Sequence, residues 1–185
     1  MKTYELNKRA KVKLVFERNV ELYMANDNKL EYKLKKQSNF SLKEGTLIVE
    51  LFLLRDYSYY ALLGAEFFPS NTNELHIVVM HGNNVTKKYL DTISYNNKFV
   101  NIGLSTEYAE SVVNTTIDFF NKSNKIPSGS LIFNMAANDE VGSSIHMFSV
   151  ITNVLLGLLL ELERLNSDEL IKDFCNERLV DLGIL

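Results

Sequence analysis

The sequence predicts an α+β fold, a two-layer sandwich in which a mixed β-sheet carries helices on one face. Residues 11–102 contain short runs that either alternate apolar and polar side chains or are continuously apolar, as strands do. Residues 105–165 then contain a helix, a strand and a second helix. Strands followed by such an ending are typical of helices gathered on one face of a sheet of roughly five strands.

The strand patterns begin at residue 11. In the first run, residues 11–17, Val12, Leu14 and Phe16 share one face, and residues 1–10 before it are polar and expected to be frayed. The other candidate strands lie at residues 20–24, 29–36, 46–54, 57–68, 75–80, 98–102 and 130–137. Residues 98–102 are either a short strand or the entry to the next helix.

The run 29–36 is only half apolar. Leu30, Tyr32 and Leu34 point to one face, and the lysines between them point to the other. Lysines are typical of an exposed sheet edge, where they hinder pairing with another chain. We therefore expect this strand at an edge.

Three helices complete the pattern. The first spans residues 105–122 with Ser105 or Thr106 as its cap, and the second begins at Ser143 or Ser144. The second helix repeats large apolar residues at three- and four-residue spacing: Phe148, Ile151, Leu155, Leu158, Leu159 and Leu162. An acidic amphipathic helix at residues 166–182 follows, and the predicted sandwich does not obviously need it.

The second helix is also long enough to be compared with a membrane span, because no charge occurs between Val141 and Leu160. Ser149, Thr152 and Asn153 lie inside this window, and Gly157 interrupts it. No basic cluster flanks the window to set an orientation. A central helix of a globular core is the better interpretation.

Composition limits the classes of function. The 185 residues suit one domain, with residues 11–165 as the sandwich and 166–185 as an added helix. A formal net charge of −3 argues against a dedicated nucleic-acid binder. The single cysteine, Cys175, excludes a disulfide within the chain, and no apolar leader segment follows Met1. We expect a bacterial or phage protein of the cytoplasm.

Two segments resemble a known family. GLSTEYAESVV, residues 103–113, is similar to the start of a helix in domain IV of translation elongation factor G. NDEVGSSIHMF, residues 138–148, resembles a second segment of that domain, with four residues in register: Val141, Ser143, Ser144 and Phe148. The resemblance implies the ribosomal protein S5 domain 2-like fold, which contains an unusual left-handed β-α-β crossover.

The chain also departs from that family. Asp139, Gly142 and Ile145 stand where the family has histidine, aspartate and glutamate. The phosphate-binding pattern G-x-x-x-x-G-K-[ST] is absent from the sequence. The resemblance therefore implies a fold, and a ribosome- or RNA-associated factor is the alternative function that it suggests.

No constellation of catalytic residues is apparent. The histidines, His76, His81 and His146, have no metal-ligand spacing between them. Ser143 and Ser144 lack the G-x-S-x-G pattern of a nucleophile and are better explained as a helix cap. We predict no enzymatic activity, no metal and no cofactor.

A surface for a protein partner is the remaining candidate. Arg55, Tyr57, Tyr59 and Tyr60 combine arginine with tyrosines, the types favoured at interface hot spots, although core filling is the default interpretation of these tyrosines. Lys33 and Lys35 of the edge strand could lie beside them. The expectation is a non-enzymatic, cytoplasmic protein-binding module of the inhibitor, immunity or accessory type. The last helix would either cap the sandwich or pair with a twin in a homodimer.

Overall fold

Eight strands form one mixed sheet in the computed structural model, which describes residues 1–17, 19–24, 28–35, 40–54, 58–82, 87–95 and 97–185. The strand order is β1-β2-β4-β5-β8-β6-β3, and β7 pairs with the end of β8. Only β6 and β8 are parallel neighbours among these pairs. The bounds are β1 Lys2–Asn7, β2 Ala10–Val15, β3 Asn28–Lys35, β4 Gly45–Leu54, β5 Ser58–Pro69, β6 Glu74–His81, β7 Val100–Ile102 and β8 Gly129–Asp139.

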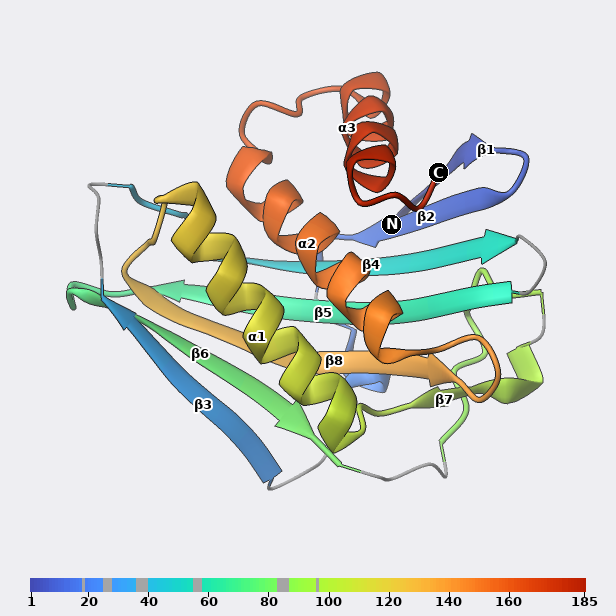
Figure 1. Cartoon of the computed structure of the whole chain (residues 1–185), viewed down its shortest axis with the longest axis horizontal. Coiled ribbons are helices and arrows are strands. Elements are labelled where there is room, and N and C mark those ends of the chain that lie inside the picture. The colour runs from blue at the N-terminus through green and yellow to red at the C-terminus, as the bar shows by residue number, and fades with distance from the viewer. Residues whose placement is uncertain (18, 25–27, 36–39, 55–57, 83–86, 96) are drawn as a thin grey trace.

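Three α-helices cover one face of this sheet (Figure 1). They are α1 at Thr106–Ser123, α2 at Ile145–Glu161 and α3 at Asp168–Asp181. The predicted α+β class, with a mixed sheet and helices on one face, is confirmed. The sheet is larger than the expected five strands or so.

The chain before residue 25 differs most from the prediction. Residues 2–7, expected to be frayed, form the edge strand β1, because α3 packs over them and buries Tyr4. The Tyr4 hydroxyl donates a hydrogen bond to Asp168 at the start of α3, at 3.1 Å. Phe16 follows the end of β2 and is exposed, and residues 20–22 form a 3-10 turn rather than a strand.

The sheet has an apolar core on each face, which explains the nearly continuous apolar runs of β4 and β5. Leu47, Val49 and Leu51 of β4 pack in the main core beneath the helices. Ile48 and Phe52 point to the opposite face, into a second cluster that includes Tyr89 and other residues: Leu22, Tyr60, Leu62, Val100, Ile102, Met135 and Ala137. Residues 87–95 contribute to covering that second face.

The connection from β6 through α1 to β8 is left-handed. In Figure 1 both strands point to the right, β6 lies below β8, and α1 lies in front of them. A chain that passes from the lower strand through a helix in front to the upper strand turns with the left hand, against the usual preference. The identity of the fold as S5 domain 2-like stays a prediction.

The turn between β8 and α2 is built by Asp139 and two serines. Asp139 is buried, and its carboxylate accepts hydrogen bonds from the backbone N–H groups of Val141 and Gly142. The Ser143 hydroxyl donates to the Tyr60 carbonyl at 2.8 Å, which ties the turn to β5. Ser144 is the N-cap of α2 and accepts from the Met147 N–H, so the cap lies within the predicted pair.

The C-terminal helix belongs to the core. Ile171, Cys175 and Leu179 of α3 are buried in the main cluster, and α3 packs against both α2 and β1. Burial raises the pKa of the Cys175 thiol to about 12, so the thiol stays protonated. None of the helices in the described part of the chain has the length and apolarity needed to span a bilayer.

Candidate functional site

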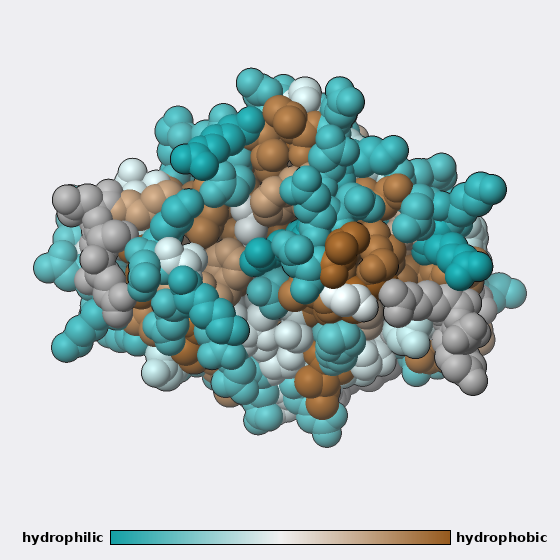
Figure 2. All heavy atoms as spheres, turned by 45° about the horizontal axis from the view of Figure 1, so that its top comes forward, coloured by the Kyte–Doolittle hydropathy of each residue, from teal (hydrophilic) through white to brown (hydrophobic). Residues whose placement is uncertain are grey.

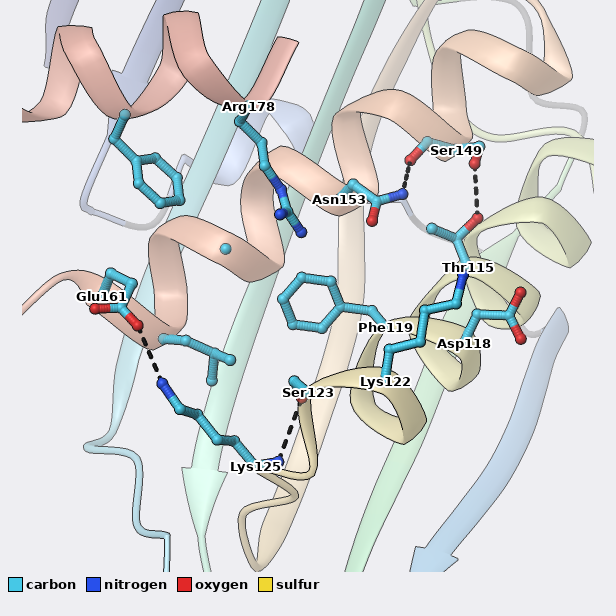
Figure 3. A pocket seen from close by; sticks show the side chains of 13 residues that line it. Thr115, Asp118, Phe119, Lys122, Ser123, Lys125, Ser149, Asn153, Glu161 and Arg178 are labelled. Carbon is cyan, nitrogen blue, oxygen red and sulfur yellow. Dashed lines mark hydrogen bonds and ion pairs between the residues drawn. The ribbon is translucent and has the colours of Figure 1, made fainter. Parts of the chain in front are cut away.

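The three helices enclose a groove of about 610 Å³ on the outer side of the helical layer (Figure 3). α1 contributes one wall, α2 the floor, and α3 the opposite wall. The lining residues are Thr115, Asp118, Phe119, Lys122 and Ser123 of α1, Lys125 after it, Ser149, Asn153, Gly157, Leu160 and Glu161 of α2, and Phe174 and Arg178 of α3.

Small and polar residues four positions apart form the floor. Ser149, Asn153 and Gly157 lie on one face of α2, since residues at this spacing are neighbours on a helix. The Thr115 hydroxyl donates to Ser149 Oγ at 3.0 Å and links α1 to α2. A Cβ at Gly157 would lie 2.9 Å from Phe174 Cζ, so the glycine lets α3 approach closely.

Two cations of the groove, Lys122 and Arg178, lack an acidic partner within the described part of the chain. Glu161 binds Lys125 at 3.2 Å and also Arg164 at 3.1 Å, so its charge is already compensated. Among the described residues, no carboxylate lies within the 4.0 Å ion-pair limit of Lys122 or Arg178. Asp118 is likewise unpaired there, but Figure 3 shows it pointing away from Arg178.

Arg178 is held in place by an aromatic ring. Its guanidinium carbon lies 5.4 Å from the centroid of the Phe119 ring, and Figure 3 shows the side chain extending between Phe119 and Asn153. Arg178 Nε is buried and has no hydrogen-bond acceptor within the described structure. Arg178 as a whole is only half-buried, so the rest of its guanidinium group, rather than Nε, is the candidate for contact with an acceptor from outside.

The groove combines these polar groups with apolar surface. Figure 2, which brings the top of the molecule in Figure 1 forward, shows brown apolar areas between hydrophilic side chains. In the groove itself, Phe119, Leu160 and Phe174 supply apolar contact beside the cations. Aromatic and arginine side chains together are typical of binding hot spots.

A second polar cluster is buried on the other face of the sheet. Glu50 of β4 accepts hydrogen bonds at one oxygen from the Tyr60 hydroxyl, at 3.0 Å, and from the Ile93 N–H, at 2.9 Å, as well as from the Thr92 hydroxyl. Its other oxygen lies 3.7 Å from Lys13 Nζ. Residues 89–93 thus cross over the cluster and are bound to it.

Lys13 is the second anchor of this crossing segment. Its side chain is buried, and Nζ lies 2.8 Å from an Asp91 carboxylate oxygen and 3.3 Å from the Tyr89 hydroxyl. It also donates to the backbone carbonyl of Asp91. Lys13 therefore connects β2 to residues 89–91 on the face away from the helices.

Burial dominates the electrostatics of the cluster. It raises the pKa of Glu50 above the usual carboxyl value, although Thr92, the Ile93 N–H and Lys13 act in the opposite direction. Burial and the nearby Glu50 carboxylate hold the pKa of Tyr60 well above its usual value. Tyr60, Thr92 and Ile93 bind one Glu50 oxygen, while the other has no hydrogen-bond partner among the described residues and faces Lys13. We assign to this cluster a contribution to stability.

Those predicted docking residues that the structure describes are not brought together. Arg55 and Tyr57 lie outside the described residues. Tyr59 is half-buried against the main core. Tyr60 is fully buried, because its ring fills the second core and its hydroxyl binds Glu50. Its predicted role in a docking surface is therefore wrong. The predicted interpretation as core filling holds for Tyr60.

The lysines of the prediction lie elsewhere on the sheet. Lys33 and Lys35 belong to β3, which is the last strand in the order, as the edge prediction required. β8 and β6 separate β3 from β5, the strand of Tyr59 and Tyr60. The expected proximity of the lysines to the tyrosines is therefore wrong, because local sequence does not reveal strand order.

Sequence reasoning missed the groove. The polar residues of α2 argue against a membrane span, but they carry a second signal: Ser149, Asn153, Gly157 and Glu161 recur every four residues and form a separate stripe of small and polar side chains. On α3, Phe174 and Arg178 have the same spacing. That these stripes face one another depends on helix packing.

Comparisons of the chain with protein-family models, with curated proteins and with solved structures found no match. Within the described residues, no group of three or more histidine, cysteine, aspartate or glutamate side chains is arranged to hold a metal ion.

Proposed function

We propose that the protein is a non-enzymatic, cytoplasmic protein-binding module of the inhibitor, immunity or accessory type, and that it docks a partner at the α1–α2–α3 groove. The observation that carries the proposal is the groove itself, in which Arg178 and Lys122 lie beside Phe119 and Phe174 without an acidic partner among the residues that the structure describes. An occupant with carboxylates and an apolar side chain would complement this lining.

A segment of a protein suits the groove because the lining is distributed along three helices. The residues from Ser149 to Glu161 extend over three turns of α2, and polar groups are spread along this length. A loop or extended peptide can meet several such groups in succession. The partner segment is therefore expected to be acidic, with an aromatic or aliphatic residue near Phe119.

Reversing the charge at the groove tests this proposal. Affinity capture from the native host, in low salt, would compare the wild type with Lys122→Glu combined with Arg178→Gln. We expect the variant to bind the partner captured by the wild type at least tenfold more weakly. Truncating hot-spot residues costs about 2 kcal/mol or more of binding free energy. Binding to the wild type should weaken as salt rises, because exposed charges are screened.

The matched control is Lys172→Glu, which reverses an exposed charge on α3 outside the groove lining. This variant is expected to keep the partner. A partner that binds the groove variant as tightly as the wild type, with both proteins folded by circular dichroism, would rule out docking at this groove.

Association with the ribosome is a second proposal, favoured by the left-handed β6–α1–β8 connection that the resemblance to elongation factor G domain IV implies. Fold by itself does not determine function. Co-sedimentation with ribosomes in low salt, lost steeply as salt rises, is the expected result. Absence of co-sedimentation in low salt would exclude this proposal.

A further inference from the structure

We infer that the α1–α2–α3 groove receives the C-terminal residue of the partner chain. Arg178 binds the terminal carboxylate, Asn153 accepts the backbone N–H of the same residue, and the aromatic rings of the groove contact its apolar side chain. This role rests on the docking proposed above and identifies which part of the partner enters the groove.

The side-chain amide of Asn153 has a fixed orientation. Its nitrogen donates a hydrogen bond to the Ser149 carbonyl oxygen at 3.0 Å, one turn earlier on α2. The amide oxygen therefore points the other way, and Figure 3 shows it directed into the groove on the side of Arg178. None of the described residues donates a hydrogen bond to this oxygen. Asn153 thus presents an acceptor to an occupant of the groove.

Arg178 lies about one helical turn from this acceptor. Its Nε is 3.6 Å from the position that a Cβ would take at Gly157, which follows Asn153 by four residues, roughly 6 Å along α2. The terminal guanidinium nitrogens have no acceptor among the described residues, and the Phe119 ring holds the group in place. A guanidinium binds a carboxylate through two parallel hydrogen bonds. The groove therefore offers donors for a carboxylate close to an acceptor for an N–H group.

The last residue of a chain combines the groups that this part of the groove complements. Its nitrogen and its carboxylate carbon are both bonded to Cα and lie roughly 2.5 Å apart. Its side chain leaves from the same Cα and remains available for Phe119, Leu160 and Phe174, which line the groove. An internal aspartate or glutamate uses its side chain for the carboxylate, so a second residue must supply the apolar contact.

N-acetyl-L-phenylalanine is a small probe with all three groups: a terminal carboxylate, a backbone N–H and an apolar ring. The groove volume of about 610 Å³ lies within the range of small-ligand pockets, about 300–1,000 Å³. We expect the wild type to bind this probe with a Kd on the order of 1 mM. An NMR titration measures the affinity, and the backbone amides that shift should be those of the groove lining.

Two analogues of the probe each remove one group. N-acetyl-L-phenylalaninamide lacks the negative charge and should bind at least tenfold more weakly, because Arg178 loses its charged partner. O-acetyl-L-3-phenyllactate has an ester oxygen in place of the N–H. This oxygen would face the Asn153 amide oxygen without a proton between them, so the analogue should bind about fivefold more weakly.

Variants of the protein assign each preference to a residue. Asn153→Leu removes the acceptor and should make the wild-type probe and its ester analogue bind equally, whereas a purely structural role would weaken both and keep their ratio. Arg178→Gln should remove the preference for the free acid over its amide. Lys172→Glu, outside the groove lining, should preserve both preferences.

The inference and the docking proposal can fail separately. Equal binding of the free acid and its amide by the wild type, or no binding of the free acid at about 10 mM, would overturn the inference. Extending the C-terminus of a captured partner by two glycines should weaken its binding at least tenfold. A partner that tolerates this extension, but not Lys122→Glu with Arg178→Gln, would overturn the role of the C-terminus and leave docking at the groove in place.

Discussion

Replacing Lys13 with methionine is expected to lower the free energy of unfolding by about 3 kcal/mol at neutral pH, because removing one partner of a buried ion pair leaves the other uncompensated. Methionine keeps most of the side-chain volume, so the loss reports the charge. Glu50 would then remain buried without its cation, and residues 89–91 would lose the Lys13 contacts. Urea denaturation monitored by circular dichroism measures the change.

The loss should depend on pH. Burial already raises the folded-state pKa of Glu50, and Lys13 counteracts that rise, so the variant raises the pKa further. A raised carboxyl pKa favours the folded state below the usual value of 4.5, and this contribution is lost as pH rises through the folded-state pKa. The variant should therefore approach the wild type near about pH 4 and fall further below it near about pH 8.

Two further variants test whether the loss of stability comes from the buried Lys13–Glu50 pair. Adding Glu50→Gln to Lys13→Met should recover most of the stability at neutral pH, since the glutamine oxygen can still accept from Tyr60, Thr92 and Ile93. Lys11→Met, on the same strand but partly exposed, should cost about 0.5 kcal/mol or less. Equal losses for Lys11→Met and Lys13→Met would contradict the assignment of the buried pair.

Replacing Gly129 with alanine is expected to cost about 3 kcal/mol, the sum of backbone strain and overpacking. Gly129 begins β8 with φ at 149°, a conformation that residues with a Cβ rarely adopt. The added Cβ would lie 2.3 Å from the Phe68 carbonyl oxygen and 2.8 Å from Phe67 Cζ. Since β8 is paired with both β5 and β6 at this residue, the backbone has little freedom to move.

Gly45→Ala is the matched control. Gly45 begins β4, and a Cβ there would have no atom within 4 Å. Alanine also reduces the entropy of the unfolded chain, so this change should be neutral or slightly stabilising. Thermal unfolding of both variants, followed by calorimetry, gives the comparison, and a Gly129→Ala protein with wild-type stability would refute the close contact.

Local patterns in the sequence were sufficient for the fold class. The apolar runs of β4 and β5, the caps Ser105 and Ser144 and the spacing along α2 depend on residues near one another in the chain. The half-apolar pattern of β3 was sufficient to predict an edge strand. These features follow from burial and hydrogen bonding within single elements, so periodicity reveals them.

The order of the strands and the meeting of distant side chains were decided only by the tertiary structure. β1 is ordered because α3, more than 150 residues away, packs on it; the Tyr4–Asp168 bond alone spans 164 residues. In the sequence, nothing distinguishes Lys13 and Glu50 from ordinary exposed charged residues. The pairing of β2 with β4 and the crossing of residues 89–93 bury them together. The groove likewise exists only because α1, α2 and α3 pack side by side, which places Arg178 beside Phe119. Such contacts depend on the three-dimensional arrangement of elements, which no spacing within one element encodes.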